Sequence, residues 1–216
     1  MRDVDVDRIE FCGGDKRPPL DRLQIVVIHK IGAMKLAAHL RRHGVVIGSD
    51  GDAFATIEEF FLRDAEGVST TTVGGSYNSK SAIRSRWYEE GIPPSHRARA
   101  HVPYHRVVDA DGRVAAFLPL DRNAAHSGMR LVNATSVAVA CVGDFEDVPP
   151  TAPQILALKY LVRDILAEHP GVHSVVGHDS VIANPKGCPG RLMRVAEVRR
   201  WAEDAAAQII AGKSRR

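Results

Sequence analysis

Cysteine is scarce in this sequence, with three residues among 216. An odd and sparse set argues against a disulfide framework and favours reducing surroundings or a role in metal binding or catalysis. Long apolar runs are also missing, because none reaches the roughly 18 residues that a membrane helix requires. The first residues, MRDVDVDRIE, lack the apolar core of a secretory signal peptide. These absences predict a protein that is synthesised in the cytoplasm and is not inserted into a membrane.

The sequence also has little excess charge. Lys and Arg number 29 against 26 Asp and Glu, for a formal net charge of +3. The basic residues form no stripe apart from the tail GKSRR, so the sequence predicts no nucleic-acid partner. With 44% hydrophobic residues, a chain of this length can bury one substantial core. We therefore expect a single globular domain.

Apolar runs rich in β-branched residues predict five strands. They cover residues 24–29, 104–109, 113–118, 136–143 and 172–178. Asp111 and Gly112 lie between the second and third runs and predict a β-hairpin.

Two helices are predicted in the last third of the chain. Thr151 and Gln154 form a capping-box pattern before a helically spaced apolar series that ends at the breaker cluster 169–171. Apolar residues repeat every three positions from Leu192 to Trp201 and predict a terminal helix that lies on the sheet. The expected fold is α/β, with a mixed central β-sheet of about five or more strands flanked by helices.

Residues 177–190, GHDSVIANPKGCPG, hold the side chains best suited to chemistry. A catalytic zinc takes three protein ligands from His, Cys or carboxylate and keeps one position open. His29 ends the first predicted strand, His178 ends the last, and Cys188 follows in a loop, so these donors can converge at one edge of a sheet. Lys186 adds a cation beside them. The alternative interpretation is structural histidines, a solvent-exposed lysine and a buried thiol.

Five segments, taken in order, resemble the motifs of a known family. They are IVVIH (25–29), YHRVVDADGRV (104–114), AAHSG (124–128), SVAVACVGDF (136–145) and GHDSVIANPKGCPG (177–190). The family is the zinc-dependent N-acetylmuramoyl-L-alanine amidases, which include phage amidase endolysins and the peptidoglycan recognition proteins. The resemblance covers about residues 21–202, and five motifs in the same order make it specific.

The resemblance implies an enzyme that cuts the amide bond between the lactyl group of N-acetylmuramic acid and L-alanine of the peptidoglycan stem peptide. It places the ligands of one zinc ion (Zn2+) per chain at His29, His178 and Cys188. Tyr104 and Lys186 fall on the tyrosine and lysine that aid the reaction in the phage enzymes.

Another branch of the family carries a catalytic glutamate in the strand predicted here at 136–143. The aligned position in this sequence is Ala140. We therefore expect the version of the reaction that uses tyrosine and lysine.

Three further residues are candidates for substrate binding. His126, in AAHSG, falls on a groove-lining position of the family, and the alternative is a plain loop histidine. His105 follows Tyr104 on a predicted strand and points to the opposite face, so a structural role is the favoured interpretation. Asn133 falls near the groove asparagine of the family, although its spacing from His126 is about two residues longer.

The resemblance divides the chain into three parts. Residues 1–20 form an N-terminal extension, 21–202 the zinc amidase domain, and 203–216 the end of the C-terminal helix and a basic tail. An insert at about 31–100 is longer than in compact phage enzymes. It would either shape a binding groove or add helical cover.

Two other functions remain open. The first is a non-catalytic peptidoglycan-binding module, although relatives that do not cleave typically lack the cysteine ligand that Cys188 provides. The second is a structural zinc, which needs four protein ligands, and no fourth lies at a sensible spacing. The expected partner is peptidoglycan, and the chain is expected to be a monomer. Without a signal peptide, it would meet the wall after lysis or dedicated export, or act on wall fragments in the cytoplasm.

Overall fold

The computed structural model describes residues 20–32, 53–54, 56–57, 103–183 and 187–213. Its elements there are η2 (Leu20–Arg22), β1 (Ile25–Ile31), β2 (Arg106–Val108), β3 (Val114–Ala116), α5 (Arg130–Thr135), β4 (Ser136–Val142), α6 (Ala152–Glu168), β5 (Ser174–Gly177), η4 (His178–Ser180) and α7 (Val195–Lys213). Most of the predicted insert at 31–100, and residues 1–19 of the predicted extension, lie outside this part of the chain. None of the helices described is long and apolar enough to span a membrane.

The strands form one five-stranded sheet in the order β3-β2-β4-β1-β5. β1 pairs in parallel with β4 and β5, β2 pairs in parallel with β4, and only β2 and β3 are antiparallel. The mixed sheet predicted from the sequence is therefore confirmed. Its last strand is shorter than predicted, because β5 ends at Gly177 and His178 begins the turn η4.

The β2–β3 hairpin closes as the Asp-Gly signal predicts. The carboxylate of Asp109 accepts hydrogen bonds from the backbone N–H groups of Asp111 (3.0 Å) and Arg113 (2.8 Å). Gly112 adopts a φ of +82°, a left-handed conformation that glycine tolerates best. The carboxylate thus accepts hydrogen bonds from backbone N–H groups of the turn.

Helix α6 begins at a cap of which only one half was predicted correctly. The hydroxyl of Thr151 accepts from the N–H of Gln154 at 3.2 Å, as expected of an N-cap. The side chain of Gln154 does not return to the cap, as a capping box would require. It donates instead to the carbonyls of Val108 (3.1 Å) and Val142 (3.0 Å), and so ties the helix to the ends of β2 and β4.

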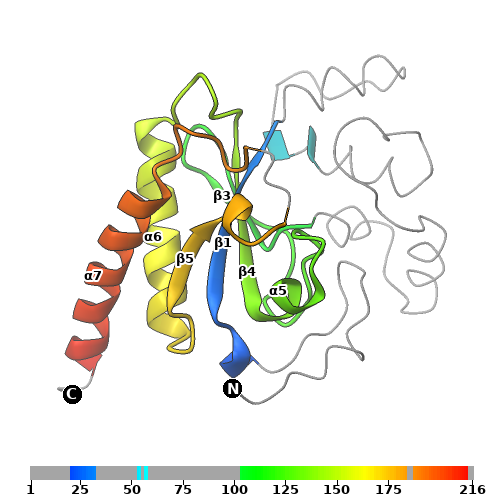
Figure 1. Ribbon diagram of the computed structural model, residues 1–216. Helices are drawn as coiled ribbons and strands as arrows, with labels where there is room; N and C mark the ends of the chain where they lie inside the picture. Colours follow the sequence, from blue (N-terminus) through cyan, green and yellow to red (C-terminus); the bar gives the residue numbers. More distant parts are fainter. Residues whose placement is uncertain (1–19, 33–52, 55, 58–102, 184–186, 214–216) are drawn as a thin grey trace.

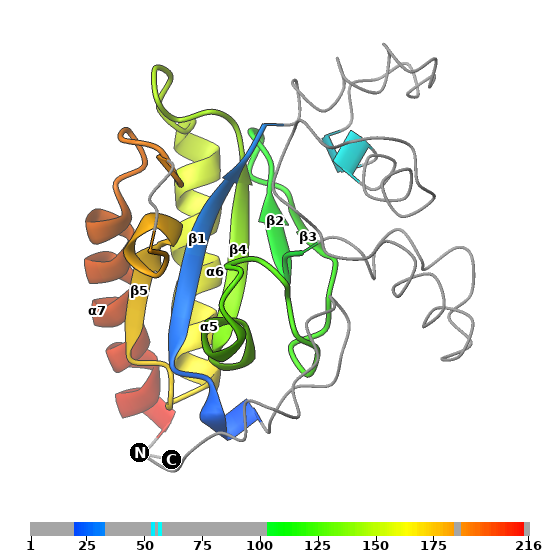
Figure 2. The ribbon, with the colours of Figure 1, turned by 45° about the vertical axis from the view of Figure 1, so that its right-hand side comes forward.

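The two faces of the sheet have different cover. Helices α6 and α7 lie side by side against one face (Figures 1 and 2). Successive residues of a strand point to opposite faces, so alternate residues meet these helices. The strand residues packed in this core are Val26, Ile28, Val108, Val137, Val139, Cys141 and Val175. His29 therefore points to the other face, where Tyr104 and the loops before α5 lie.

Candidate metal centre

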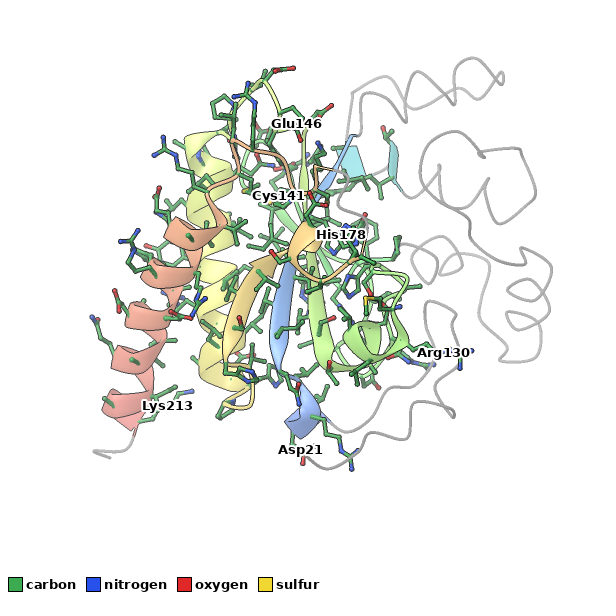
Figure 3. All side chains as sticks on the ribbon, in the orientation of Figure 1. Asp21, Arg130, Cys141, Glu146, His178 and Lys213 are labelled. Atoms are coloured by element: carbon green, nitrogen blue, oxygen red, sulfur yellow. The ribbon has the colours of Figure 1, made fainter. Side chains whose placement is uncertain are left out.

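Three donor side chains converge at the carboxyl ends of β1 and β5. His29 comes from β1, His178 from the turn η4, and Cys188 from the loop that follows. One ligand atom from each lies within 4.8 Å of the others. The rings of His29 and His178 have centroids 4.3 Å apart. Figure 3 shows His178 on its short turn in front of the central strands.

The loop that carries Cys188 is fixed on both sides. Gly187 and Gly190 adopt φ values of +71° and +104°, which residues other than glycine rarely adopt. A Cβ at Gly190 would come within 2.7 Å of the backbone of Phe145, so the loop also lies too close for a larger residue. The backbone N–H of Lys30 points at the sulfur of Cys188 from 3.5 Å. The thiol is therefore held against the end of β1.

Burial sets the protonation of two of the donors. It lowers the pKa of His29 well below its ordinary value, and the neighbouring His126 and His178 lower it further. Burial also raises the pKa of the Cys188 thiol to about 11. His29 is thus a neutral imidazole at pH 7, ready to bind a metal, whereas Cys188 must lose a proton to become a ligand.

This donor set fits zinc. Zn–S bonds of about 2.3 Å and Zn–N bonds of about 2.0 to 2.1 Å place nitrogen and sulfur about 3.6 Å apart around a tetrahedral ion. Nδ1 of His29 lies 3.8 Å from Sγ of Cys188. Within the described residues, no other group of three such donors comes together, and this group contains no fourth. Three ligands and one open position are the pattern of a catalytic zinc, whereas a structural zinc is closed by four.

Tyr104 lies directly beside the donors. Its ring centroid is 5.1 Å from that of His29. Burial raises the pKa of its hydroxyl above the ordinary value, and the nearby Cys188 raises it further. The hydroxyl therefore keeps its proton at neutral pH and can donate a hydrogen bond to an oxygen near the metal position.

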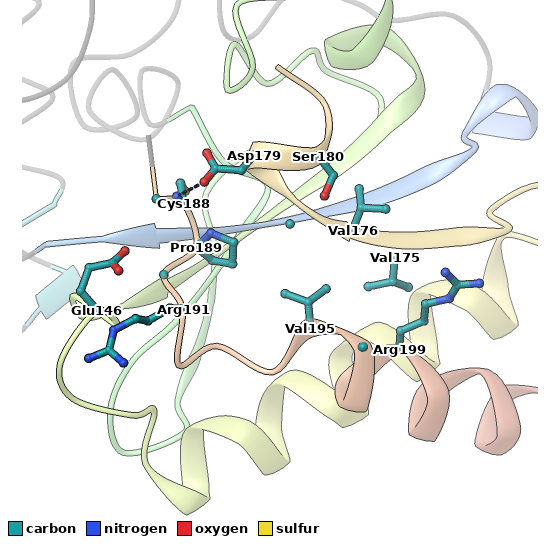
Figure 4. Close-up of a pocket in the computed structure, with 14 residues that line it drawn as sticks. Glu146, Val175, Val176, Asp179, Ser180, Cys188, Pro189, Arg191, Val195 and Arg199 are labelled. Atoms are coloured by element: carbon teal, nitrogen blue, oxygen red, sulfur yellow. Dashed lines mark hydrogen bonds between the residues drawn. The ribbon is translucent and has the colours of Figure 1, made fainter. Parts of the chain in front are cut away.

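A pocket of about 490 Å³ lies beside the loop that carries Cys188 (Figure 4). It lies between β5, the loop and the start of α7, and its walls include Asp179, Cys188 and Arg199. Of the three donors, only Cys188 lines it. The pocket therefore adjoins the site only through the cysteine.

The sequence model of the N-acetylmuramoyl-L-alanine amidase family matches residues 19–191. The chain belongs to this family. The resemblance inferred from the five motifs is thus confirmed. No curated protein matches the sequence.

Several solved structures are similar to this amidase-family chain. A selenomethionine derivative of AmpD is 18% identical, with a TM-score of 0.52 over 88% of this chain and 89% of that one. PGRP-SA of Apis mellifera is 15% identical, with a TM-score of 0.52 over 88% of each chain. The Ph2119 endolysin of a Thermus scotoductus bacteriophage is 23% identical, with a TM-score of 0.45 over 89% of this chain and 92% of that one. The first two likenesses confirm the amidase and recognition-protein fold.

The position of the glutamate found in another branch of the amidase family adjoins the donors. Ala140 of β4 stands beside His29 of β1 in the parallel register. Ala140 is fully buried and offers only a methyl group. This chain therefore has no carboxylate at that position.

The structure gives His105 a setting that favours the structural interpretation over substrate binding. Its ring is fully buried. Nδ1 accepts from the backbone N–H of Ala138 at 2.9 Å, and Nε2 lies 2.9 Å from the carbonyl oxygen of Arg122. The ring thus joins β4 to the loop after β3.

The two remaining candidates for substrate binding also have partners within the protein. Asn133 is buried, and its side-chain oxygen accepts from the N–H (3.0 Å) and the hydroxyl (2.7 Å) of Ser127. His126 directly precedes Ser127, and its Nδ1 lies 2.8 Å from Nε2 of His29. Asn133 thus holds the loop at Ser127, and His126 contacts a donor directly. Lys186 lies outside the described residues.

Sequence reasoning overlooked two residues that support the donors. Asp179 binds the backbone of Cys188, and Ser136 lies 2.7 Å from Nε2 of His126. In the sequence, only the position of Asp179 directly after His178 could have indicated its role. Ser136 begins an apolar strand, and nothing in its sequence context marks it.

Proposed function

We propose that the protein is a zinc-dependent N-acetylmuramoyl-L-alanine amidase that hydrolyses the bond between N-acetylmuramic acid and L-alanine of the stem peptide. The observation that carries this proposal is the convergence of His29, His178 and Cys188 within 4.8 Å in a chain of this family. The proposed partner is peptidoglycan.

His29, His178 and Cys188 would hold the ion. When bound, zinc supplies a water nucleophile at neutral pH and polarises the carbonyl of the amide. Cys188 would give up its proton and bring a negative charge to the site, whereas the two histidines would bind as neutral rings. The group contains three donors and no fourth among the described residues, which is the number that a catalytic zinc takes from the protein.

The remaining steps belong to Tyr104 and, by the family resemblance, to Lys186. Tyr104 stays protonated beside His29 and would donate a hydrogen bond to the carbonyl oxygen as it gains negative charge. Lys186 would add positive charge at the same oxygen. Because Ala140 leaves no carboxylate next to His29, these two residues would also help to move the proton to the leaving amine.

The test is incubation of the purified protein with isolated peptidoglycan, with and without a zinc chelator. Mass spectrometry then searches for free stem peptides that begin with L-alanine. The proposal expects these peptides, and expects the chelator and the substitution Cys188→Ala to abolish them. Absence of the peptides, with the protein still sedimenting with wall material, would favour the binding module instead.

A further inference from the structure

A chain of hydrogen bonds runs away from the metal position on the buried side of His29. Nε2 of His29 lies 2.8 Å from Nδ1 of His126, and Nε2 of His126 lies 2.7 Å from the hydroxyl of Ser136. That hydroxyl donates to the backbone carbonyl of Val132. His29 is 1% exposed, His126 9% and Ser136 0%, so bulk water has little access to this chain.

The far end of this hydrogen-bond chain, at Ser136, determines where each proton in it lies. Ser136 has one hydroxyl proton, and it points to the carbonyl of Val132, in helix α5, which runs directly into β4 (Figure 2). The oxygen of Ser136 can then only accept from His126. Nε2 of His126 therefore carries a proton. In a neutral ring, Nδ1 of His126 is left as an acceptor.

The same logic fixes the tautomer of His29. Two facing nitrogens at 2.8 Å share one proton, and Nδ1 of His126 has none to give. Nε2 of His29 must supply it. Nδ1 of His29 then has a free electron pair, and this is the atom that lies 3.8 Å from the sulfur of Cys188.

We propose that His126, with Ser136 behind it, is a positioning residue that holds His29 in the tautomer whose Nδ1 is free to bind the metal. The inference rests on the metal-binding part of the proposed function. It assigns His126 to the support of a ligand, where the sequence had suggested contact with the substrate. The His126 ring stands nearly perpendicular to that of His29, at 88° with centroids 4.8 Å apart, and so also restricts its rotation.

Partners of this kind raise the basicity of a ligating histidine and fix its orientation, and their loss typically costs 10- to 100-fold in metal affinity or activity. The two ends of the chain are contributed by elements far apart in sequence. His29 belongs to β1, whereas Ser136 is the first residue of β4. The pairing of β1 with β4 that builds the sheet thus also determines where Ser136 lies relative to His29.

The first measurement is nuclear magnetic resonance of the zinc-free protein labelled with 15N at histidine. Long-range 1H–15N correlations distinguish a ring protonated at Nε2 from one protonated at Nδ1. Wild-type His29 is expected to be protonated at Nε2. In His126→Ala the two tautomers should mix, and zinc affinity, measured by competition with a chelating dye, should fall about 10- to 100-fold.

Two further variants distinguish a role of His126 in orienting His29 from a general effect on the stability of the fold. In His126→Asn the side-chain oxygen takes the place of Nδ1 and still accepts from His29, so the Nε2 tautomer and most of the zinc affinity should return. Ser136→Ala removes the acceptor behind His126 and should give an intermediate loss. His105→Asn is the matched control, because it alters an equally buried histidine whose partners are Ala138 and Arg122.

Each outcome decides the matter. A wild-type His29 protonated at Nδ1 overturns the proposal, as does a tautomer or zinc affinity that does not change in His126→Ala. Equal losses in the Asn and Ala variants, or in His105→Asn, would mean that folding alone is affected, and also overturn it. If His126→Ala does not fold, the wild-type spectrum and Ser136→Ala still give the decision. A protein that meets these expectations but leaves peptidoglycan uncut refutes the proposed function alone.

Discussion

Asp179 and Cys188 hold each other through two hydrogen bonds. The N–H of Cys188 donates to Oδ2 of Asp179 at 2.8 Å (Figure 4). The N–H of Asp179 donates to the carbonyl of Cys188 at 2.9 Å. Since Asp179 follows His178 directly, this pair links the backbone at two of the three donors. The spacing between a histidine and a thiol ten residues apart is thereby fixed before any metal binds.

Replacement of Asp179 should weaken metal binding only where the new side chain cannot accept the hydrogen bond from the N–H of Cys188. We expect Asp179→Ala to lower zinc affinity about 10- to 100-fold, because the cysteine loop loses its anchor. Asp179→Asn keeps a carbonyl oxygen and should stay near the wild type. It also removes a negative charge that raises the pKa of the Cys188 thiol, so the change cannot disfavour the thiolate. Equal losses in the two variants, measured by dye competition, would contradict this role.

Cys188 and Lys186 should separate metal binding from rate. Cys188→Ala removes a donor and should lose zinc, as measured by metal analysis after gel filtration. Lys186→Ala removes a charge that the family resemblance assigns to the reacting oxygen, and should keep zinc while losing activity. Loss of zinc to the same extent in both variants would refute this division.

Tyr104→Phe should lower the rate and leave zinc bound. The substitution retains the ring that packs 5.1 Å from His29 and removes only the hydroxyl. Loss of one preorganised donor typically costs about 3 kcal/mol, or roughly 100-fold in kcat. The release of stem peptides over time measures the rate, and metal content serves as the control. An unchanged kcat would exclude the hydroxyl from the reaction.

Cys188 should contribute about one of the protons that zinc binding releases at pH 7.5, in addition to any proton lost by a zinc-bound water. Its thiol has a pKa of about 11, whereas His29 is already neutral there because its pKa is lowered. Between about pH 7 and pH 10, this deprotonation alone should raise the apparent zinc affinity about tenfold for each pH unit. Calorimetry in buffers of different ionisation enthalpy counts the protons. Cys188→Asp, whose carboxylate is ionised at this pH, should release about one fewer.

The stability of the protein should fall at alkaline pH because of Cys141. Burial raises the pKa of this thiol from its ordinary 9.0 to about 12 in the folded state. Its contribution is therefore complete below about pH 9 and is lost as pH rises toward 12, by at most about 1.4 kcal/mol per pH unit. Urea unfolding of wild type and Cys141→Ala across this range tests it. Parallel curves for the two proteins would contradict the assignment.

The sequence predicted the parts of the fold that depend on local pattern. Alternating and β-branched runs located the five strands of the described residues, and Asp111-Gly112 located the hairpin. Partners chosen by tertiary packing were missed. Gln154 looked like half of a capping box, but two strand carbonyls at the sheet end compete for its side chain. The two histidines were found, although β1 continues past His29 to Ile31, and His178 begins η4 instead of ending β5.

The candidate site was predictable as a set of donors and not as a network. His29 and His126 are separated by 97 positions, and their hydrogen bond depends on how β1, β4 and the loop before α5 meet. No local pattern encodes such a distance. His126 was therefore assigned to the groove, while the structure turns both of its ring nitrogens toward protein partners.

The separation of the two sheet faces also matters for handling the protein. Because α6 and α7 cover the face away from Tyr104 and His29, the outer side of α7 is a suitable place for attachment. Gln208 is exposed there. A chain tethered to a bead or fused to a carrier through this position would be attached on the side of the sheet opposite the donors.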